Sequence, residues 1–201
     1  MTNEVADQAH EKRSNLALWV LTASFFIPAF LAYIYFYYGD RPAIKSNGEL
    51  IIPVVDIHTL GMTGTAGAEL SEEELTPHWR MLYFVGSSCD SSCQTSLYNM
   101  RQINIGIGKY QDRVNHGIVH LAEPDEAFVE LIEKEHKAAG RIYTTIDKIS
   151  SITELEANPS QLQSIYLVDP LGNIMMHFPK DLEPKLINKD MNKLLKVSRL
   201  R

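Results

Sequence analysis

The most informative segment of this chain is residues 79–100, WRMLYFVGSSCDSSCQTSLYNM. Its first seven residues, 79–85, are mainly apolar, which predicts a buried strand. Apolar residues then recur at helical spacing, which predicts a helix over residues 93–104. Cys89 follows the predicted strand and Cys93 opens the predicted helix, and the sequence contains no other cysteine. The two thiols therefore lie together at a junction between a strand and a helix.

A thiol at the start of a helix has a physical use. The free backbone amides and the positive end of the helix dipole stabilise a thiolate, which is a nucleophile and a metal ligand. Soft thiolates also select Cu(I) among biological metals. The pair Cys89 and Cys93 is therefore a redox couple, a pair of metal ligands, or two structural core residues. A copper site would need a third donor, usually a histidine or a methionine.

Strands and helices alternate on the C-terminal side of this junction. The further predicted elements, in chain order, are a strand at 117–121, a helix at 124–140, a hairpin at 164–178 and a helix at 180–201. Alternation of this kind predicts parallel strand pairing with both faces of the sheet covered. The closing hairpin and helix narrow the fold class to an α/β, thioredoxin-like sandwich.

The N-terminal part predicts a membrane anchor. Residues 16–38, LALWVLTASFFIPAFLAYIYFYY, contain no charged side chain over 23 positions. A helix of this length spans about 34 Å, which is enough to cross a bilayer core. The run is too long for a signal peptide and lacks a small-residue cleavage site. We therefore expect a short cytoplasmic tail at 1–15, a transmembrane helix at 16–38, a linker at 39–48 and a thioredoxin-like domain at 49–201.

Charge bears on orientation and on partners. Lys12 and Arg13 abut the apolar run, which favours a cytoplasmic N-terminus, although Arg41 and Lys45 follow the run. The net charge is −6, and residues 1–48 hold equal numbers of acidic and basic side chains, so the globular part carries all of it. An acidic domain without a basic stripe argues against nucleic acid as a partner.

Three segments resemble one known family. The segment at 79–100 resembles the Sco/SenC branch of the thioredoxin superfamily, SIYLVDPLGNIMMHF at 164–178 resembles its closing hairpin, and LAEPDEAF at 121–128 resembles the loop after its third strand. The resemblance covers about residues 50–198 and the membrane anchor. It implies a copper-binding or thiol-reducing factor in the assembly of the copper A centre of cytochrome c oxidase.

The same resemblance implies the site, the partners and the location. Cys89 and Cys93 would be the copper or redox pair, and Cu(I) the metal. The partners would be the membrane, the copper-site subunit of the oxidase or other assembly factors. The domain would face the periplasm of a bacterial inner membrane, or the equivalent side of the mitochondrial inner membrane.

The chain departs from the family pattern at three positions. The family places a histidine ligand five residues before the aromatic that corresponds to Tyr166, and this position is Gln161. The cis-proline that thioredoxin-like reductases carry before this strand corresponds to about Gln163, because Pro159 lies too far back. The family's proline after the second cysteine is Gln94.

Another histidine would then have to complete a copper site. His120 ranks first, because it ends a predicted central strand at the edge where such folds place their chemistry. His177 at the end of the hairpin ranks second. The other candidates are His58, His78 and three thioethers, Met62, Met175 and Met176, whereas His116 and His136 are expected on the surface.

Three functions remain open. In a reductase, an enzyme, Cys89 would attack a client disulfide and Cys93 would resolve the mixed disulfide. In a metallochaperone, the two thiolates would hold Cu(I) and pass it on. A non-catalytic accessory protein of a respiratory membrane complex would bury the pair away from polar neighbours. We expect Cα atoms within about 7 Å of each other and Cys89 as the more exposed thiol.

Overall fold

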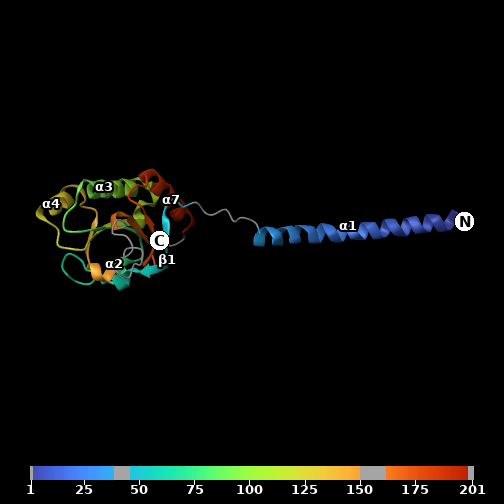
Figure 1. The fold of residues 1–201 in the computed structure, drawn as a ribbon, viewed down its shortest axis with the longest axis horizontal. Coiled ribbons are helices and arrows are strands. Elements are labelled where there is room, and N and C mark those ends of the chain that lie inside the picture. The colour runs from blue at the N-terminus through green and yellow to red at the C-terminus, as the bar shows by residue number, and fades with distance from the viewer. Residues whose placement is uncertain (1, 39–45, 150–161, 199–201) are drawn as a thin grey trace. The chain divides into compact units, whose positions relative to one another are not determined.

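The structure is a computed structural model that describes residues 2–38, 46–149 and 162–198, without the side chains of residues 2–17. The chain divides into two compact units, Met1–Lys45 and Ser46–Arg201. The described part of the first unit is a single helix, and the second unit is an α/β domain (Figure 1).

The helix α1, Thr2–Tyr38, begins before the predicted transmembrane span and continues through Pro28. Its segment Leu18–Tyr38 is long and apolar enough to cross a membrane. The large apolar side chains of this segment are exposed, and Phe25, for example, is 83% exposed. The predicted N-terminal membrane-spanning helix is confirmed in its length and composition.

The domain is built on one six-stranded sheet. Its strands are β1 (Glu49–Asp56), β2 (Trp79–Val85), β3 (Val114–His120), β4 (Gly140–Tyr143), β5 (Ile165–Val168) and β6 (Asn173–Phe178). Their order is β1-β6-β5-β2-β3-β4. The strands β2, β3 and β4 pair in parallel, whereas β5, β6 and β1 join antiparallel on the other side of β2. The sheet therefore combines the parallel pairing predicted from the alternating strands and helices with the antiparallel pairing of the predicted hairpin.

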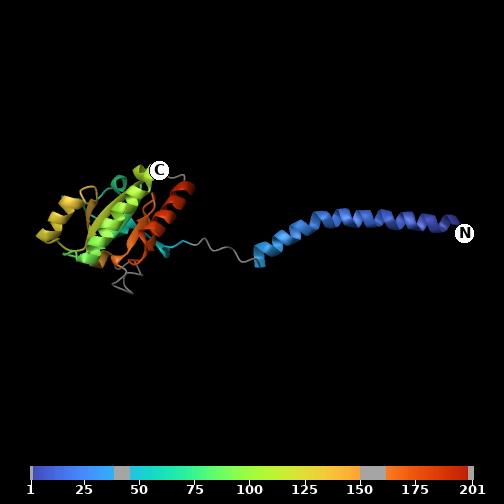
Figure 2. The same ribbon diagram turned by 90° about the horizontal axis from the view of Figure 1, so that it is seen from above.

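Helices cover both faces of the sheet. The other described elements of the domain are the 3-10 turns η1 (Ile57–Leu60) and η2 (Gly108–Arg113) and the helices α2 (Glu72–Leu75), α3 (Ser91–Gly106), α4 (Glu126–Glu135), α5 (Ile146–Ile149) and, after the last strand, α7 (Pro184–Val197). Figure 1 shows α3, α4 and α7 on one side and α2 on the other, and Figure 2 shows α3 and α7 side by side. The predicted sandwich is confirmed.

The strand β2 is the centre of the core because every residue of it is buried. Successive side chains of a strand point to opposite faces. Met81 and Tyr83 accordingly pack with α3, α4 and α7, and Leu82 and Phe84 pack with η1, α2 and α5. A seven-residue strand that is apolar on both faces fits only a position between two layers.

Several elements differ from the prediction. The strand at 79–85 is as predicted, and α3 begins two residues earlier and ends two residues later than the predicted 93–104. The helix predicted at 124–140 ends at Glu135, and β4 follows it from Gly140. This edge strand has only four residues and includes the charged Arg141, so no apolar run marks it in the sequence.

Asp190 of α7 anchors the segment that leads into β1. Its side chain is 4% exposed. Its Oδ2 accepts hydrogen bonds from the backbone N–H of Asn47 at 2.5 Å, from Asn47 Nδ2 at 3.1 Å and from Ser46 Oγ at 3.4 Å. Lys193 Nζ lies 3.7 Å from its Oδ1. Hydrogen bonds to Asp190 therefore connect the start of the domain, Ser46 and Asn47, to the helix α7.

We predict that Asp190→Ala lowers the free energy of unfolding of the full-length chain in detergent by about 2 kcal/mol, because Ser46 and Asn47 lose their hydrogen bonds to a buried, charged acceptor. Urea denaturation followed by tryptophan fluorescence measures this change. Asp181→Ala, at an exposed carboxylate, is the matched control and should change stability by less than about 0.5 kcal/mol. Equal effects of the two substitutions would contradict the anchoring role.

Candidate functional site

The loop between β2 and α3, residues 86–90, carries the first cysteine to the edge of the sheet. Neighbouring backbone holds the loop at both sides. Leu121 N donates to the carbonyl of Val85 at 2.9 Å, and Asp125 N donates to the carbonyl of Ser87 at 2.8 Å. The chain after β3 therefore supports the loop after β2, as adjacent parallel strands place their carboxyl ends at one edge.

Cys89 and Cys93 form a disulfide in the structure, with a Cα–Cα distance of 5.2 Å. The predicted closeness of the two residues is confirmed. Both cysteines are half-buried and pack against the apolar cluster under α3. The prediction that Cys89 is more exposed than Cys93 stays a prediction for the reduced thiols. The disulfide joins the loop before α3 to the first turn of that helix.

Asp90, between the two cysteines, caps the N-terminus of α3. Its Oδ1 accepts a hydrogen bond from Cys93 N at 2.8 Å, and its carbonyl accepts one from Gln94 N at 2.9 Å. Aspartate is among the preferred N-cap residues because its short carboxylate reaches these unpaired amides. Gln94 Nε2 also donates to the Cys89 carbonyl at 3.2 Å. Gln94, which stands at the position of the family proline, thus stabilises the loop through its side-chain hydrogen bond.

A cavity of about 280 Å³ opens beside Cys93. Its walls combine apolar side chains with polar groups from the loop, and they comprise Tyr83, Phe84, Val85, Gly86, Ser88, Asp90, Cys93, Leu121, Leu162 and Gln163. The cavity has the mixed lining of a site that receives part of a partner molecule.

Gln163 lies in the wall of this cavity, at about the position that corresponds to the cis-proline expected of thioredoxin-like reductases. Its Oε1 accepts a hydrogen bond from Lys180 Nζ at 2.8 Å. Among the described residues, the cis X–Pro bonds precede Pro53 and Pro77, and neither proline lines the cavity. Gln161, the position of the family histidine, lies outside the described residues.

Tyr83 is buried in the core, 1% exposed, and contributes to the lining of the same cavity. Burial raises the pKa of Tyr83, a hydrogen bond with Ser96 opposes this rise, and the charge of Asp90 adds to it. The hydroxyl therefore stays protonated at neutral pH and can donate a hydrogen bond. The sequence pattern did not single out Tyr83, because a tyrosine within a buried strand reads as a core residue.

His120, the predicted third ligand, packs elsewhere on the cysteine side of the sheet. It is 1% exposed, and its ring lies 5.0 Å from that of Tyr143 and 5.4 Å from that of Phe128. Neither ring nitrogen has a hydrogen-bond partner among the described residues. Burial lowers the pKa of His120 to about 4, and the charge of Arg141 contributes. His120 is therefore a neutral core residue.

The other histidines are dispersed. His177 is buried, and its Nε2 lies 3.3 Å from Glu49 Oε2 across the β1–β6 pair. His58 is exposed and His78 is half-buried. The expectation that His136 lies on the surface is wrong, because it is 5% exposed at the C-terminus of α4, and His116 is half-buried.

A resident copper ion does not fit the described residues. In this part of the chain, no three side chains of histidine, cysteine, aspartate or glutamate form a group that could hold a metal. His120 is thus not brought together with the cysteine pair, and the two sulfurs are bonded to each other. Reduction of the disulfide would supply two soft donors, but the third donor stays a prediction.

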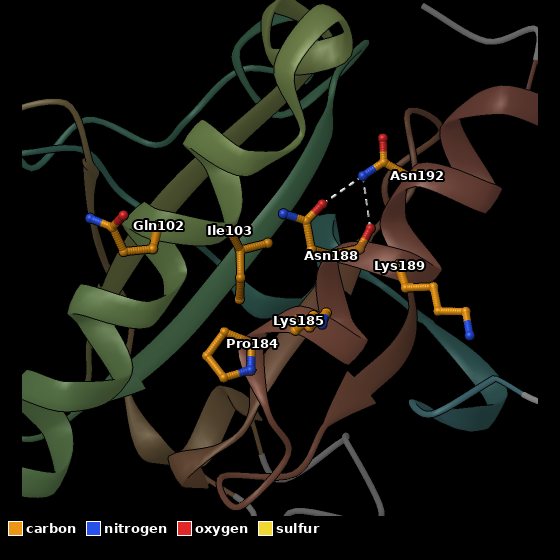
Figure 3. Close-up of a pocket in the computed structure, with 7 residues that line it drawn as sticks. All are labelled: Gln102, Ile103, Pro184, Lys185, Asn188, Lys189 and Asn192. Carbon is orange, nitrogen blue, oxygen red and sulfur yellow. Dashed lines mark hydrogen bonds between the residues drawn. The ribbon is translucent and has the colours of Figure 1, made fainter.

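A second, larger groove of about 400 Å³ runs between α3 and α7. Figure 3 shows its lining of amide, lysine and apolar side chains, with Asn192 Nδ2 bonded to the Asn188 side chain. The residues that line this groove include no cysteine and no histidine. The smaller cavity, which Cys93 lines, is therefore the candidate functional site.

Comparison with known proteins agrees with this geometry. A family model described as "Transmembrane-like, thioredoxin-like, C-terminal domain" matches residues 79–198. None of the curated proteins matches the chain.

Solved structures share the fold. The chain is similar to yeast Sco1 with copper bound (TM-score 0.53, 17% identity, 76% of this chain and 94% of that chain covered). It is also similar to Arabidopsis thaliana ScoI with copper bound (TM-score 0.52, 15% identity, 66% and 93% covered). A third match is a thiol:disulfide interchange protein from Bacteroides sp. (TM-score 0.50, 16% identity, 76% and 91% covered). The predicted resemblance to Sco/SenC proteins is confirmed as a divergent relationship that shows the fold.

The burial of His120 predicts a pH dependence of stability. Its pKa is about 4 in the folded chain and about 6.5 when unfolded, so the unfolded state binds the proton more readily. The stability that the neutral ring contributes is therefore present at neutral pH and is lost as the pH falls from about 6.5 towards 4. We expect a loss of roughly 3 kcal/mol over this range, because each pKa unit corresponds to about 1.4 kcal/mol.

His120→Phe should remove this part of the pH dependence, because phenylalanine keeps an aromatic ring against Tyr143 and Phe128. Urea denaturation at several pH values measures the slope. The control His58→Gln, at an exposed position, should leave the wild-type slope unchanged. An identical slope for wild type and His120→Phe would contradict the assignment of His120 as a neutral core residue.

Proposed function

The chain belongs to the transmembrane-like, thioredoxin-like C-terminal domain family, and on this premise we propose that it is a membrane-anchored protein of thiol–disulfide exchange. The observation that carries the proposal is the Cys89–Cys93 disulfide across the first turn of α3. A half-buried pair beside an open cavity can pass between disulfide and dithiol without rearrangement of the core. The fold shared with a thiol:disulfide interchange protein supports the same chemistry.

The reduced pair would act on a client disulfide in two steps. The Cys89 thiolate attacks one client sulfur, which forms a mixed disulfide and releases the other client sulfur as a thiolate that takes up a proton. Cys93 then loses its proton and attacks Cys89 Sγ, which releases the second client thiol and restores the Cys89–Cys93 disulfide. Two electrons pass to the client, and a protein dithiol has to return them.

The site offers groups for each step. Cys89 lies in the loop before α3, and Cys93 lies in the first turn, so the two sulfurs meet without movement of a strand. Tyr83 lines the same cavity as Cys93 and its phenol remains protonated, so a hydrogen bond donated by this phenol would stabilise a developing thiolate. Asp90 and Ser88 supply further polar groups at the cavity wall.

We further propose that the client is the copper-site subunit of a cytochrome c oxidase or another factor in its assembly. Thiol ligands have to be reduced and deprotonated before they bind a metal. A reductase that keeps client cysteines reduced would therefore prepare a copper site without holding copper itself. The resemblance of residues 79–100 and 164–178 to Sco/SenC proteins supports this client.

The proposed location is the outer face of a bacterial inner membrane, or its mitochondrial equivalent. The span Leu18–Tyr38 would anchor the chain. Lys12 and Arg13 before it favour a cytoplasmic N-terminus. The domain would then face a compartment in which disulfides form. Client proteins that need free thiols in that compartment would require a reductant, and this domain would supply it.

Two other functions are weaker. A non-catalytic accessory protein would bury its cysteines away from polar groups, whereas Cys93 shares its cavity with Asp90, Ser88 and Gln163. Copper as a transferred cargo draws support from the relatives that were solved with copper bound. On this chain, however, the cargo would have only two thiolates as grouped ligands among the described residues.

Trapping of the mixed disulfide tests the exchange reaction. Full-length chain in detergent is reduced, freed of reductant and mixed with a peptide that contains one internal disulfide. We predict that wild type releases the peptide as a dithiol. Cys93→Ser should accumulate a covalent adduct through Cys89, because the resolving thiol is missing.

Cys89→Ser is the matched control and should accumulate at least about tenfold less adduct, since it lacks the attacking thiol. Non-reducing electrophoresis and mass spectrometry quantify the adducts. Adduct on Cys93 in preference to Cys89 would reverse the assigned roles, and a lack of both adduct and peptide reduction would overturn the proposed function.

A further inference from the structure

The carboxylate of Asp90 lies beside the redox pair. It holds Cys93 N at 2.8 Å. The amide nitrogen and Sγ of one cysteine are separated by covalent geometry alone, so the carboxylate is within roughly 6–7 Å of the Cys93 sulfur. Asp90 is also the direct neighbour of Cys89 in the sequence. Its negative charge therefore acts on both sulfurs.

This carboxylate opposes the usual effect of a helix start. Unpaired amides and the helix dipole stabilise a thiolate at this position. Here the Cys93 amide is already bonded to Asp90 Oδ1, and the next amide, that of Gln94, is bonded to the Asp90 carbonyl. Asp90 makes no ion pair with a lysine or arginine of the described segments that would neutralise its charge. A thiolate thus meets an unbalanced negative charge.

The two oxidation states feel this charge differently. The sulfurs of a disulfide are neutral and are not repelled by a carboxylate. Reduction produces thiols whose ionised forms are repelled, because like charges destabilise each other at this separation. The carboxylate therefore lowers the free energy of the disulfide relative to that of the reduced pair. A pair with a strongly favoured disulfide gives up electrons readily when it is reduced.

We infer that Asp90 is a positioning residue that biases the Cys89–Cys93 pair towards its disulfide and so directs the reduced domain to donate electrons to client disulfides. The inference rests on the proposed exchange function and specifies its direction. The overall reaction is that of the two-step exchange above: the client disulfide is reduced to two thiols while the Cys89–Cys93 dithiol is oxidised. A donor of the protein-dithiol class returns the two electrons.

Neutral caps isolate the charge from the capping geometry. Asparagine and serine both cap helices by accepting the same backbone hydrogen bond, so Asp90→Asn and Asp90→Ser keep the start of α3. Asp56 provides a matched control, since its Oδ1 accepts from His58 N at 2.9 Å at the start of η1, on the opposite face of the sheet. Asp56→Asn removes an equivalent charge away from the cysteines.

The test is the equilibrium of the full-length chain in detergent with reduced and oxidised glutathione at neutral pH. Both Asp90 variants should shift the equilibrium constant about fivefold towards the dithiol, which corresponds to a reduction potential about 20 mV less negative. Asp56→Asn should shift it less than about twofold. Circular dichroism shows whether each variant is folded. If either Asp90→Asn or Asp90→Ser does not fold, the other variant still tests the inference.

Two results would overturn the inference: Asp90 variants within about twofold of wild type, or a shift towards the disulfide. The measurement needs no client, so it is independent of the proposed function. A shifted potential with failed trapping of the peptide would retain the role of Asp90 and reject exchange with clients. Successful trapping with an unshifted potential would retain exchange and reject the role of Asp90.

Discussion

The capping of α3 by Asp90 is the interaction on which the site depends. It sets the first turn of the helix between the two cysteines, so Cys89 lies in the preceding loop while Cys93 lies on the helix. The turn brings the two Cα atoms to 5.2 Å, within the range that a disulfide spans. The buried strand β2 supplies the rigid base from which the loop leaves. A buried central strand and one capped helix therefore suffice to bring the two cysteines together at a sheet edge.

Much of this arrangement can be predicted from the sequence. The strand at 79–85 is predicted by its nearly continuous apolar run, because a strand that is buried on both faces needs apolar side chains at successive positions. The helix after it is predicted by apolar residues at helical spacing, because only one side of the helix is buried. The charge-free run of α1 is equally clear. The strand β4 escaped prediction because four residues at a sheet edge bury too few side chains to leave a period. Its absence from the prediction did not alter the fold class, which β2, β3 and the β5–β6 hairpin determine.

The site was less predictable than the fold. The sequence indicates that His120 ends a strand, but the packing of its ring between Tyr143 and Phe128 depends on the β3–β4 register and on the docking of α4. The roles of Asp90 and Tyr83 were missed for different reasons. An aspartate just before a helix is a recognisable cap, so its proximity to the thiols was within reach of sequence reasoning. The place of Tyr83 in the cavity lining depends on the alternation of faces along β2, which a strand buried on both faces does not reveal.

The central claim is that Cys89 and Cys93 act as a dithiol–disulfide couple and do not form a resident copper site. Anaerobic titration of the reduced full-length chain with Cu(I), in competition with a chelator of known affinity, tests this claim most directly. We expect an affinity no greater than that of a two-thiolate peptide, lost in Cys89→Ser and Cys93→Ser and unchanged in His120→Ala. A one-to-one complex that is much tighter and is weakened at least about tenfold by His120→Ala would contradict it.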